Sequence, residues 1–215
     1  MALIIGSLIG FGMNIVLEYF DNTIRSIEYI ERKKLPILAI IPSIGNGLAK
    51  KLWKRNKNNN SSIYNGNQVG NIERRLITHE EPTSPISEAY RSLRTSLMYT
   101  KKGTQGSIMV SSPGPGEGKT TTIINLAITF ANIGKKTLLI DADLRKPVIK
   151  KVFDGKDQPG LTHYLSGIET SLSSIIRSSE ISNLDIIYNG AIPPNPSELL
   201  SSELMSDLIQ ELKNK

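Results

Sequence analysis

The chain contains no cysteine and only two histidines, His79 and His163. The absence of cysteine excludes a disulfide framework and fits a reducing compartment. The two histidines lack the spacing of metal ligands, so we assign them no role. The net charge is +6, yet no basic stretch is interleaved with aromatic residues and no nucleic-acid-binding motif is present. A nucleic-acid partner is therefore not expected.

A glycine-rich stretch at residues 111–122 follows a short apolar run and precedes an apolar segment with helical periodicity. The run Ile108-Met109-Val110 predicts a buried strand, and residues 123–130 predict a helix. Strand, glycine-rich loop, Lys-Thr and helix is the layout of a phosphate-binding loop. Its glycines let backbone N–H groups approach phosphates, and the helix N-terminus adds partial positive charge.

The residue types of this loop suggest how a nucleotide would be held. Lys119 can supply a full charge to β- and γ-phosphates, and the Thr120 hydroxyl can ligate Mg²⁺. Pro113 stands where the strict pattern has its first glycine, so an unrelated Gly/Pro turn is the alternative. The residues that we expect to contact the nucleotide are Pro115, Gly116, Glu117, Gly118, Lys119, Thr120, Thr121 and Arg145.

A second motif, Asp-x-Asp-x-Arg, ends the apolar run at residues 138–140. Gly134 before it marks the expected end of the preceding helix. In an open parallel sheet ligands bind at the carboxyl ends of strands, so Asp141 and Asp143 should face the phosphate site. One could hold Mg²⁺ and the other could position or deprotonate a hydroxyl, and the sequence does not assign the roles. A solvated acidic turn is the alternative.

Together the two motifs resemble those of the bacterial tyrosine kinases of the capsular and exopolysaccharide co-polymerase family. The resemblance is carried by Pro-x-x-Gly-Lys-Thr at 115–120 and Leu-Ile-Asp-x-Asp-x-Arg-Lys-Pro at 139–147. Partitioning ATPases of the ParA/MinD type are related, but they usually carry a lysine where this chain has Gly114. The resemblance implies an α/β fold, a parallel P-loop NTPase-type sheet with flanking helices.

Two further stretches carry the same resemblance. Glu88, Arg91 and Arg94 match an E-x-x-R-x-x-R signature on a helix expected at 88–99, which in those kinases mediates ring-like self-association; surface salt bridging is the alternative. A proline-rich loop at 190–200 runs into a helix expected at 196–212. We also expect a helix near 161–165 and a strand at 184–188.

The first 22 residues predict one transmembrane helix, because residues 2–20 are apolar except Ser7, Asn14 and Glu18. A buried core helix is the alternative. Basic residues follow at 25–57, so the remainder should be cytoplasmic at a bacterial plasma membrane, close to anionic lipid. We expect a juxtamembrane segment at 23–42, a flexible polar linker at 43–80 and the front part of a kinase domain at 81–215.

No apolar strand ending in Asp, the family's Walker B element, follows residue 197, and no C-terminal tyrosine cluster is present. We therefore expect this sequence to be a piece of a longer protein, with an incomplete sheet that folds poorly alone and is inactive as a kinase without the rest. The resemblance implies an ATP- and Mg²⁺-dependent tyrosine autokinase that regulates polysaccharide polymerisation and export. Its implied partners are its own copies, the polymerase and export machinery, and a tyrosine phosphatase. The alternatives are a ParA/MinD-type ATPase switch and a catalytically inactive scaffold.

Overall fold

The structure is a computed structural model that describes residues 6, 10–13, 27–42, 76–100, 106–155 and 159–213. The chain divides into two units, Met1–Leu38 and Ala39–Lys215, which are described separately.

In the first unit, residues 10–13 are helical and α2 spans Ile27–Arg32. A turn ends α2, with Lys34 at φ 55° and its N–H donating to the Glu31 carbonyl at 2.8 Å. Within the described residues no helix is both long and apolar enough to cross a membrane. Most of the predicted transmembrane helix at 1–22 and most of the predicted linker at 43–80 lie outside the described residues.

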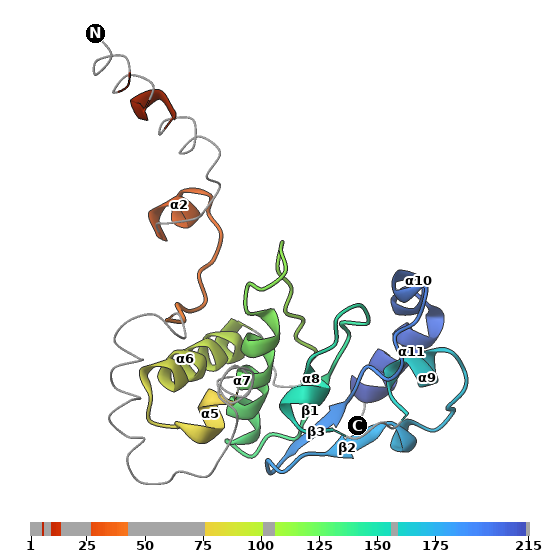
Figure 1. Cartoon of the computed structure of the whole chain (residues 1–215). Helices are drawn as coiled ribbons and strands as arrows, with labels where there is room; N and C mark the ends of the chain where they lie inside the picture. Colours follow the sequence, from red (N-terminus) through yellow and green to blue (C-terminus); the bar gives the residue numbers. More distant parts are fainter. Residues whose placement is uncertain are drawn as a thin grey trace, which may run out of the picture. The chain divides into compact units, whose positions relative to one another are not determined.

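The second unit is built on a three-stranded sheet of order β1-β3-β2 (Figure 1). Strand β1 spans Thr137–Ile140, β2 spans Ile176–Ser178 and β3 spans Leu184–Ile187. Strands β1 and β3 are parallel, with Leu139 beside Ile186, whereas β2 is antiparallel to β3. The sheet is therefore mixed, and the prediction of a parallel sheet is correct only for the pair β1 and β3.

Alternating side chains of the sheet belong to two apolar cores, because successive residues of a strand point to opposite faces. Leu139 and Ile186 pack with α7 (Lys119–Ala131) and α8 (Ile149–Val152). Ile140 and Ile187 pack with α9 (Leu161–Leu165), with the 3-10 helix η2 (Leu172–Ser174) and with α11 (Glu203–Lys213). Helices thus cover both faces, as the apolar composition of β1 and β3 requires.

Helices α5 (Ile77–Glu80) and α6 (Pro85–Thr100) pack on α7 (Figure 1). Ile77 and Thr78 are buried, so the packed part of the second unit already includes the last residues of the segment that we predicted as a linker. The predicted helix at 88–99 is confirmed as part of α6.

The C-terminal end of α7 shows why a glycine is found at position 134. Gly134 has φ 79°, its N–H donates to the Ala131 carbonyl, and the Lys135 N–H donates to the Phe130 carbonyl. These two bonds form a Schellman motif, which favours glycine at the left-handed position. Gly134 therefore ends α7 and turns the chain into β1, as predicted.

The predicted strand at 108–110 is absent: residues 106–110 pair with no described strand, and Met109 is 90% exposed. An apolar run becomes a strand only when a neighbour takes its backbone hydrogen bonds, and β1 pairs only with β3 among the described strands. The predicted helix at 196–212 is instead two helices, α10 (Pro196–Leu200) and α11. The break follows from Ser202, whose Oγ accepts the Met205 N–H at 3.3 Å and so caps α11.

Candidate nucleotide and metal site

The phosphate-binding loop has the backbone that its glycines predicted. Gly116 and Gly118 have φ values of 81° and 88°, a region that side chains with a Cβ rarely adopt. Gly118 is the residue before α7, and its carbonyl accepts the Thr122 N–H at 2.8 Å. At the start of the loop the Ser112 hydroxyl donates to the Gly114 carbonyl at 2.8 Å. The loop therefore turns directly into the first turn of a 13-residue helix.

Lys119 and Thr120 are the first two residues of α7, and both are half-buried. The first N–H groups of a helix have no partner within it, so this end can hold an anion. Lys119 forms no ion pair with another described residue. Its charge is thus available to a ligand at this helix end. Pro115 and Glu117 are exposed on the loop, and Thr121 follows on α7.

Asp141 lies directly after β1 and is only 3% exposed. Its Oδ1 accepts the Asp143 N–H at 3.2 Å, and its Oδ2 accepts the Ile149 N–H at 3.3 Å. Burial raises the pKa of Asp141 to about 6, although these hydrogen bonds oppose the shift. A buried carboxylate without a cationic partner pays a desolvation cost that a nearby cation would offset.

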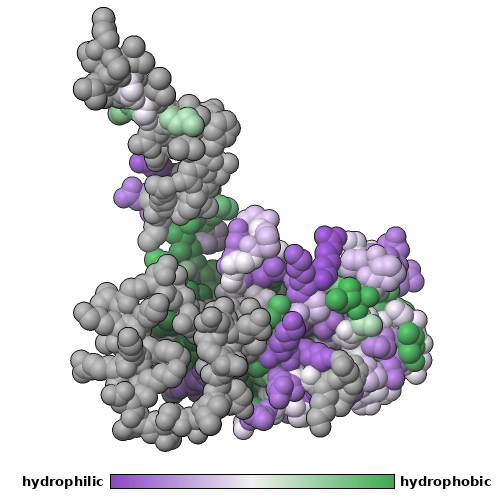
Figure 2. Space-filling view, viewed as in Figure 1, coloured by the Kyte–Doolittle hydropathy of each residue, from purple (hydrophilic) through white to green (hydrophobic). Residues whose placement is uncertain are grey.

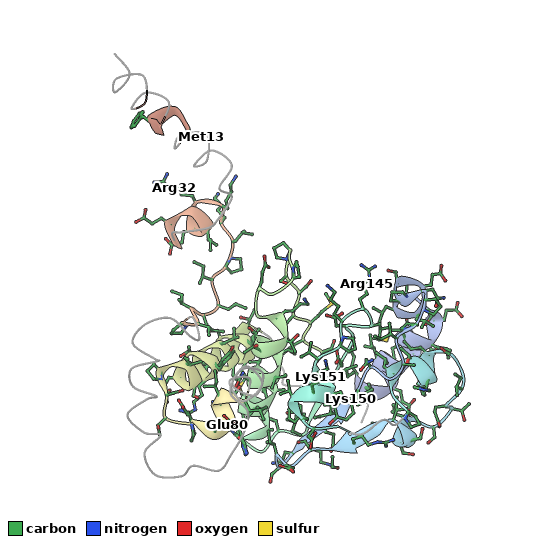
Figure 3. All side chains as sticks on the ribbon, viewed as in Figure 1. Met13, Arg32, Glu80, Arg145, Lys150 and Lys151 are labelled. Carbon is green, nitrogen blue, oxygen red and sulfur yellow. The ribbon has the colours of Figure 1, made fainter. Side chains whose placement is uncertain are left out.

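Asp143 is more accessible than Asp141 and shapes the loop after β1. Its Oδ1 accepts the N–H groups of Arg145 and Lys146 at 3.3 and 2.9 Å. Its other oxygen accepts no hydrogen bond from the described residues. Arg145 Nη2 donates to Ser197 Oγ at 3.2 Å, and Figure 3 shows Arg145 on the loop after β1, close to α10.

Topology brings the two motifs to one end of the sheet. The chain leaves the end of α7 at Gly134 and enters β1, which packs against α7. Because β1 returns along α7, its carboxyl end lies at the N-terminal end of that helix. Lys119 and Thr120 therefore share an end of the domain with Asp141 and Asp143.

The described residues offer few ligands for a divalent metal ion. No group of three or more histidine, cysteine or acidic residues there could hold a metal ion alone. Two carboxylates and the Thr120 hydroxyl are oxygen ligands of the kind that Mg²⁺ takes together with waters and substrate phosphates. The donor set fits a metal that arrives with a nucleotide.

The structure gives the predicted oligomerisation residues contacts within the chain. Arg91 forms an ion pair with Glu88 and donates from Nη2 to the Pro82 carbonyl at 2.6 Å. Arg94 Nη1 donates to the Thr129 carbonyl of α7 at 2.7 Å. That carbonyl belongs to the last turn of α7, where it lacks a helical partner, so Arg94 caps the helix. Contact between copies through these residues stays a prediction.

Sequence reasoning missed a buried link between α5 and α7. Asn125 is fully buried, and its Oδ1 accepts hydrogen bonds from Thr78 N and Thr78 Oγ1 at 2.9 and 3.0 Å. Its Nδ2 donates to the Thr121 carbonyl at 2.8 Å. The only signal in the sequence was a polar residue among the apolar positions of α7.

Comparison with known proteins agrees with this geometry. The model of a family described as an AAA domain matches residues 106–211. The tyrosine-protein kinase YwqD of Bacillus subtilis (strain 168) is 44% identical over 146 residues, which are 67% of this chain and 61% of YwqD. The kinase domain of the Escherichia coli tyrosine kinase ETK superposes with a TM-score of 0.72 at 30% identity, covering 89% of this chain and 70% of that domain. The chain belongs to the bacterial tyrosine-kinase family.

The crystal structure of the chimerical protein CapA2B2 is similar as well, with a TM-score of 0.68 at 34% identity over 87% of this chain and 70% of the chimera. The chain spans less than two thirds of the length of the curated kinases that it matches. The 111–122 loop, called the P-loop below, and the 139–147 segment both lie within the residues that the family model matches.

Proposed function

We propose that the chain is part of a membrane-anchored, ATP-dependent protein tyrosine autokinase that regulates polymerisation and export of extracellular or capsular polysaccharide. Family membership supports the kinase class. The observation that carries the proposal is the shared position of the Lys119–Thr120 helix end and the Asp141–Asp143 loop.

In this proposal the nucleotide phosphates lie over the start of α7. Lys119 and the backbone N–H groups at Gly116 and Gly118 hold the β- and γ-phosphates, and the Thr120 hydroxyl is a metal ligand. Mg²⁺, when bound, neutralises phosphate charge during transfer. We place Arg145, which donates to Ser197 in this structure, among the residues that contact the nucleotide.

The two carboxylates receive different roles because their surroundings differ. Asp141 is buried and its oxygens are engaged by backbone N–H groups, so we place it beside the metal. Asp143 is partly exposed and has one oxygen without a hydrogen bond, so we place it where it accepts the proton of the attacking tyrosine hydroxyl.

The cellular setting is proposed from the sequence. Residues 1–22 would cross the bacterial plasma membrane, and the chain after about residue 22 would be cytoplasmic, with its basic residues near anionic lipid. Copies would assemble into a ring through Glu88, Arg91 and Arg94. The polysaccharide polymerase and export machinery and a tyrosine phosphatase would be the partners.

The products of ATP consumption distinguish a kinase from an ATPase switch. The complete protein that contains this chain is incubated with Mg²⁺ and ATP labelled at the γ-phosphate, and label is measured in protein tyrosine and in inorganic phosphate. The proposal predicts label in tyrosine that is lost in Asp143→Asn. Release of inorganic phosphate without phosphotyrosine would support the ParA/MinD-type alternative and refute the kinase. Nucleotide binding with neither product would support the inactive scaffold.

A further inference from the structure

The tyrosines that the structure describes in the second unit differ sharply in accessibility. Tyr90 is 1% exposed, and Tyr164 and Tyr188 are half-buried, whereas Tyr99 is 86% exposed. A phosphoryl acceptor has to bring its hydroxyl to the phosphate bound at another site. Of these tyrosines, only Tyr99 can do so without disturbing a core.

Tyr99 also lies where the backbone can open at little cost. It is the penultimate residue of α6, which ends at Thr100. The last turn of a helix lacks part of its hydrogen bonds and frays readily. Lys101 and Lys102 follow in the sequence, and their charges favour approach to a bound nucleotide. Figure 2 shows that hydrophilic side chains predominate on the visible described face of the second unit.

We propose that Tyr99 is an acceptor for phosphoryl transfer between copies of this chain; this rests on the proposed function.

Helix α6 runs alongside α7 in the same direction, because Tyr90 bonds with Thr122 near the start of α7 and Arg94 bonds with Thr129 near its end. Tyr99 therefore lies beyond the far end of α7, beside Ile133. A 13-residue helix is about 20 Å long, so Lys119 of the same copy is out of reach and the ATP is held by a second copy.

The transfer needs no reactant beyond ATP. Tyr99 Oη attacks the γ-phosphorus of ATP on the second copy, and an Oη–P bond forms as the bond from that phosphorus to the β,γ-bridging oxygen breaks. ADP leaves with the bond's electron pair, and the phenolic proton passes to Asp143 of the copy that holds ATP.

The Arg94 guanidinium lies close enough to Tyr99 to pair with the product phosphate. Tyr99 and Arg94 line the same surface hollow with Thr95, Met98 and Ile133. Arg94 uses Nη1 for the Thr129 carbonyl, and its buried Nε has no hydrogen-bond partner in the part of the chain that the structure describes. A phosphate of about two negative charges on Tyr99 would pair with this guanidinium by a small rearrangement of the side chain.

Site mapping by tandem mass spectrometry tests the proposal. Isotope-labelled full chain carrying Lys119→Met is mixed with Mg·ATP and with the unlabelled, complete wild-type protein that contains this chain, so phosphate on the labelled chain reports transfer between copies. We expect phosphate on Tyr99 of the labelled chain. Tyr99→Phe in that chain should remove most of its phosphotyrosine, and Tyr164→Phe, at a half-buried site, should leave it unchanged.

The two proposals fail differently. Phosphotyrosine in the wild-type chain with none on Tyr99 of the labelled chain overturns the assignment of Tyr99 and leaves the kinase proposal standing. Phosphate on Tyr99 of the wild-type chain alone overturns transfer between copies. A complete absence of phosphotyrosine overturns both proposals.

Discussion

Replacing Asn125 with alanine tests the buried link between α5 and the helix that follows the P-loop. The alanine leaves the Thr78 N–H, in a residue that is 2% exposed, without its acceptor. An unsatisfied buried donor costs about 1–3 kcal/mol, and losing the bond to the Thr121 carbonyl adds about 1 kcal/mol. The Thr78 hydroxyl keeps a second acceptor, the Asn125 carbonyl at 3.3 Å. We therefore expect the free energy of unfolding to fall by about 2–4 kcal/mol.

Urea unfolding followed by circular dichroism measures this change, with equal m-values required for the comparison. Asn132→Ala is the matched control, because Asn132 is exposed just beyond α7, and surface changes of this kind shift stability by less than about 0.5 kcal/mol. If Asn125→Ala stays within that range too, α5 does not depend on Asn125 and the reasoning is wrong.

Two further predictions concern Asp141, which follows β1, and Gly160, which precedes α9 and packs against the backbone after β3. Burial raises the pKa of Asp141 from 3.8 to about 6, so this carboxyl loses its proton at a lower pH in the unfolded chain than in the folded one. The free energy of unfolding should therefore fall by about 3 kcal/mol as the pH rises from 3.8 to about 6. Asp141→Asn should abolish that fall, and identical pH profiles of unfolding for the two proteins would contradict it. A Cβ on Gly160 would lie 2.4 Å from the Tyr188 carbonyl oxygen, a backbone atom that cannot rotate away, so Gly160→Ala should cost about 3 kcal/mol. Gly167→Ala, with nothing within 4 Å, should cost only the strain of its positive φ, about 1–2 kcal/mol; equal losses in thermal unfolding would refute the packing argument.

The sequence predicted the elements whose own residues determine their structure. The run at 138–140 is apolar throughout, begins shortly after Gly134 and is followed directly by Asp141, so it forms a strand wherever a neighbour exists, and β1 confirms it. The helix at 161–165 is confirmed with the same bounds. The P-loop backbone could be predicted because glycine is strongly favoured at the positive φ values of positions 116 and 118.

Elements that depend on distant neighbours could not be predicted. Strand β2 is the short polar segment Ile-Arg-Ser, which pairs because a turn at Asn183, with φ 63°, folds it back onto β3. Residues 108–110 have the composition of a strand but no partner among the described strands. The hydrogen bond of Arg94 within the chain likewise depends on tertiary structure, because its acceptor, the Thr129 carbonyl, is 35 residues away in the sequence.

Loss of the P-loop lysine tests the central claim most directly. Phosphotyrosine formation is measured with Mg·ATP in the complete protein that contains this chain, for the wild type, for Lys119→Met and for the control Lys136→Met, an exposed lysine just before β1. Removing a charge that stabilises the transferring phosphoryl group should lower the rate by at least about 100-fold, while the control keeps the wild-type rate. Phosphotyrosine formation by Lys119→Met at the wild-type rate would contradict the account.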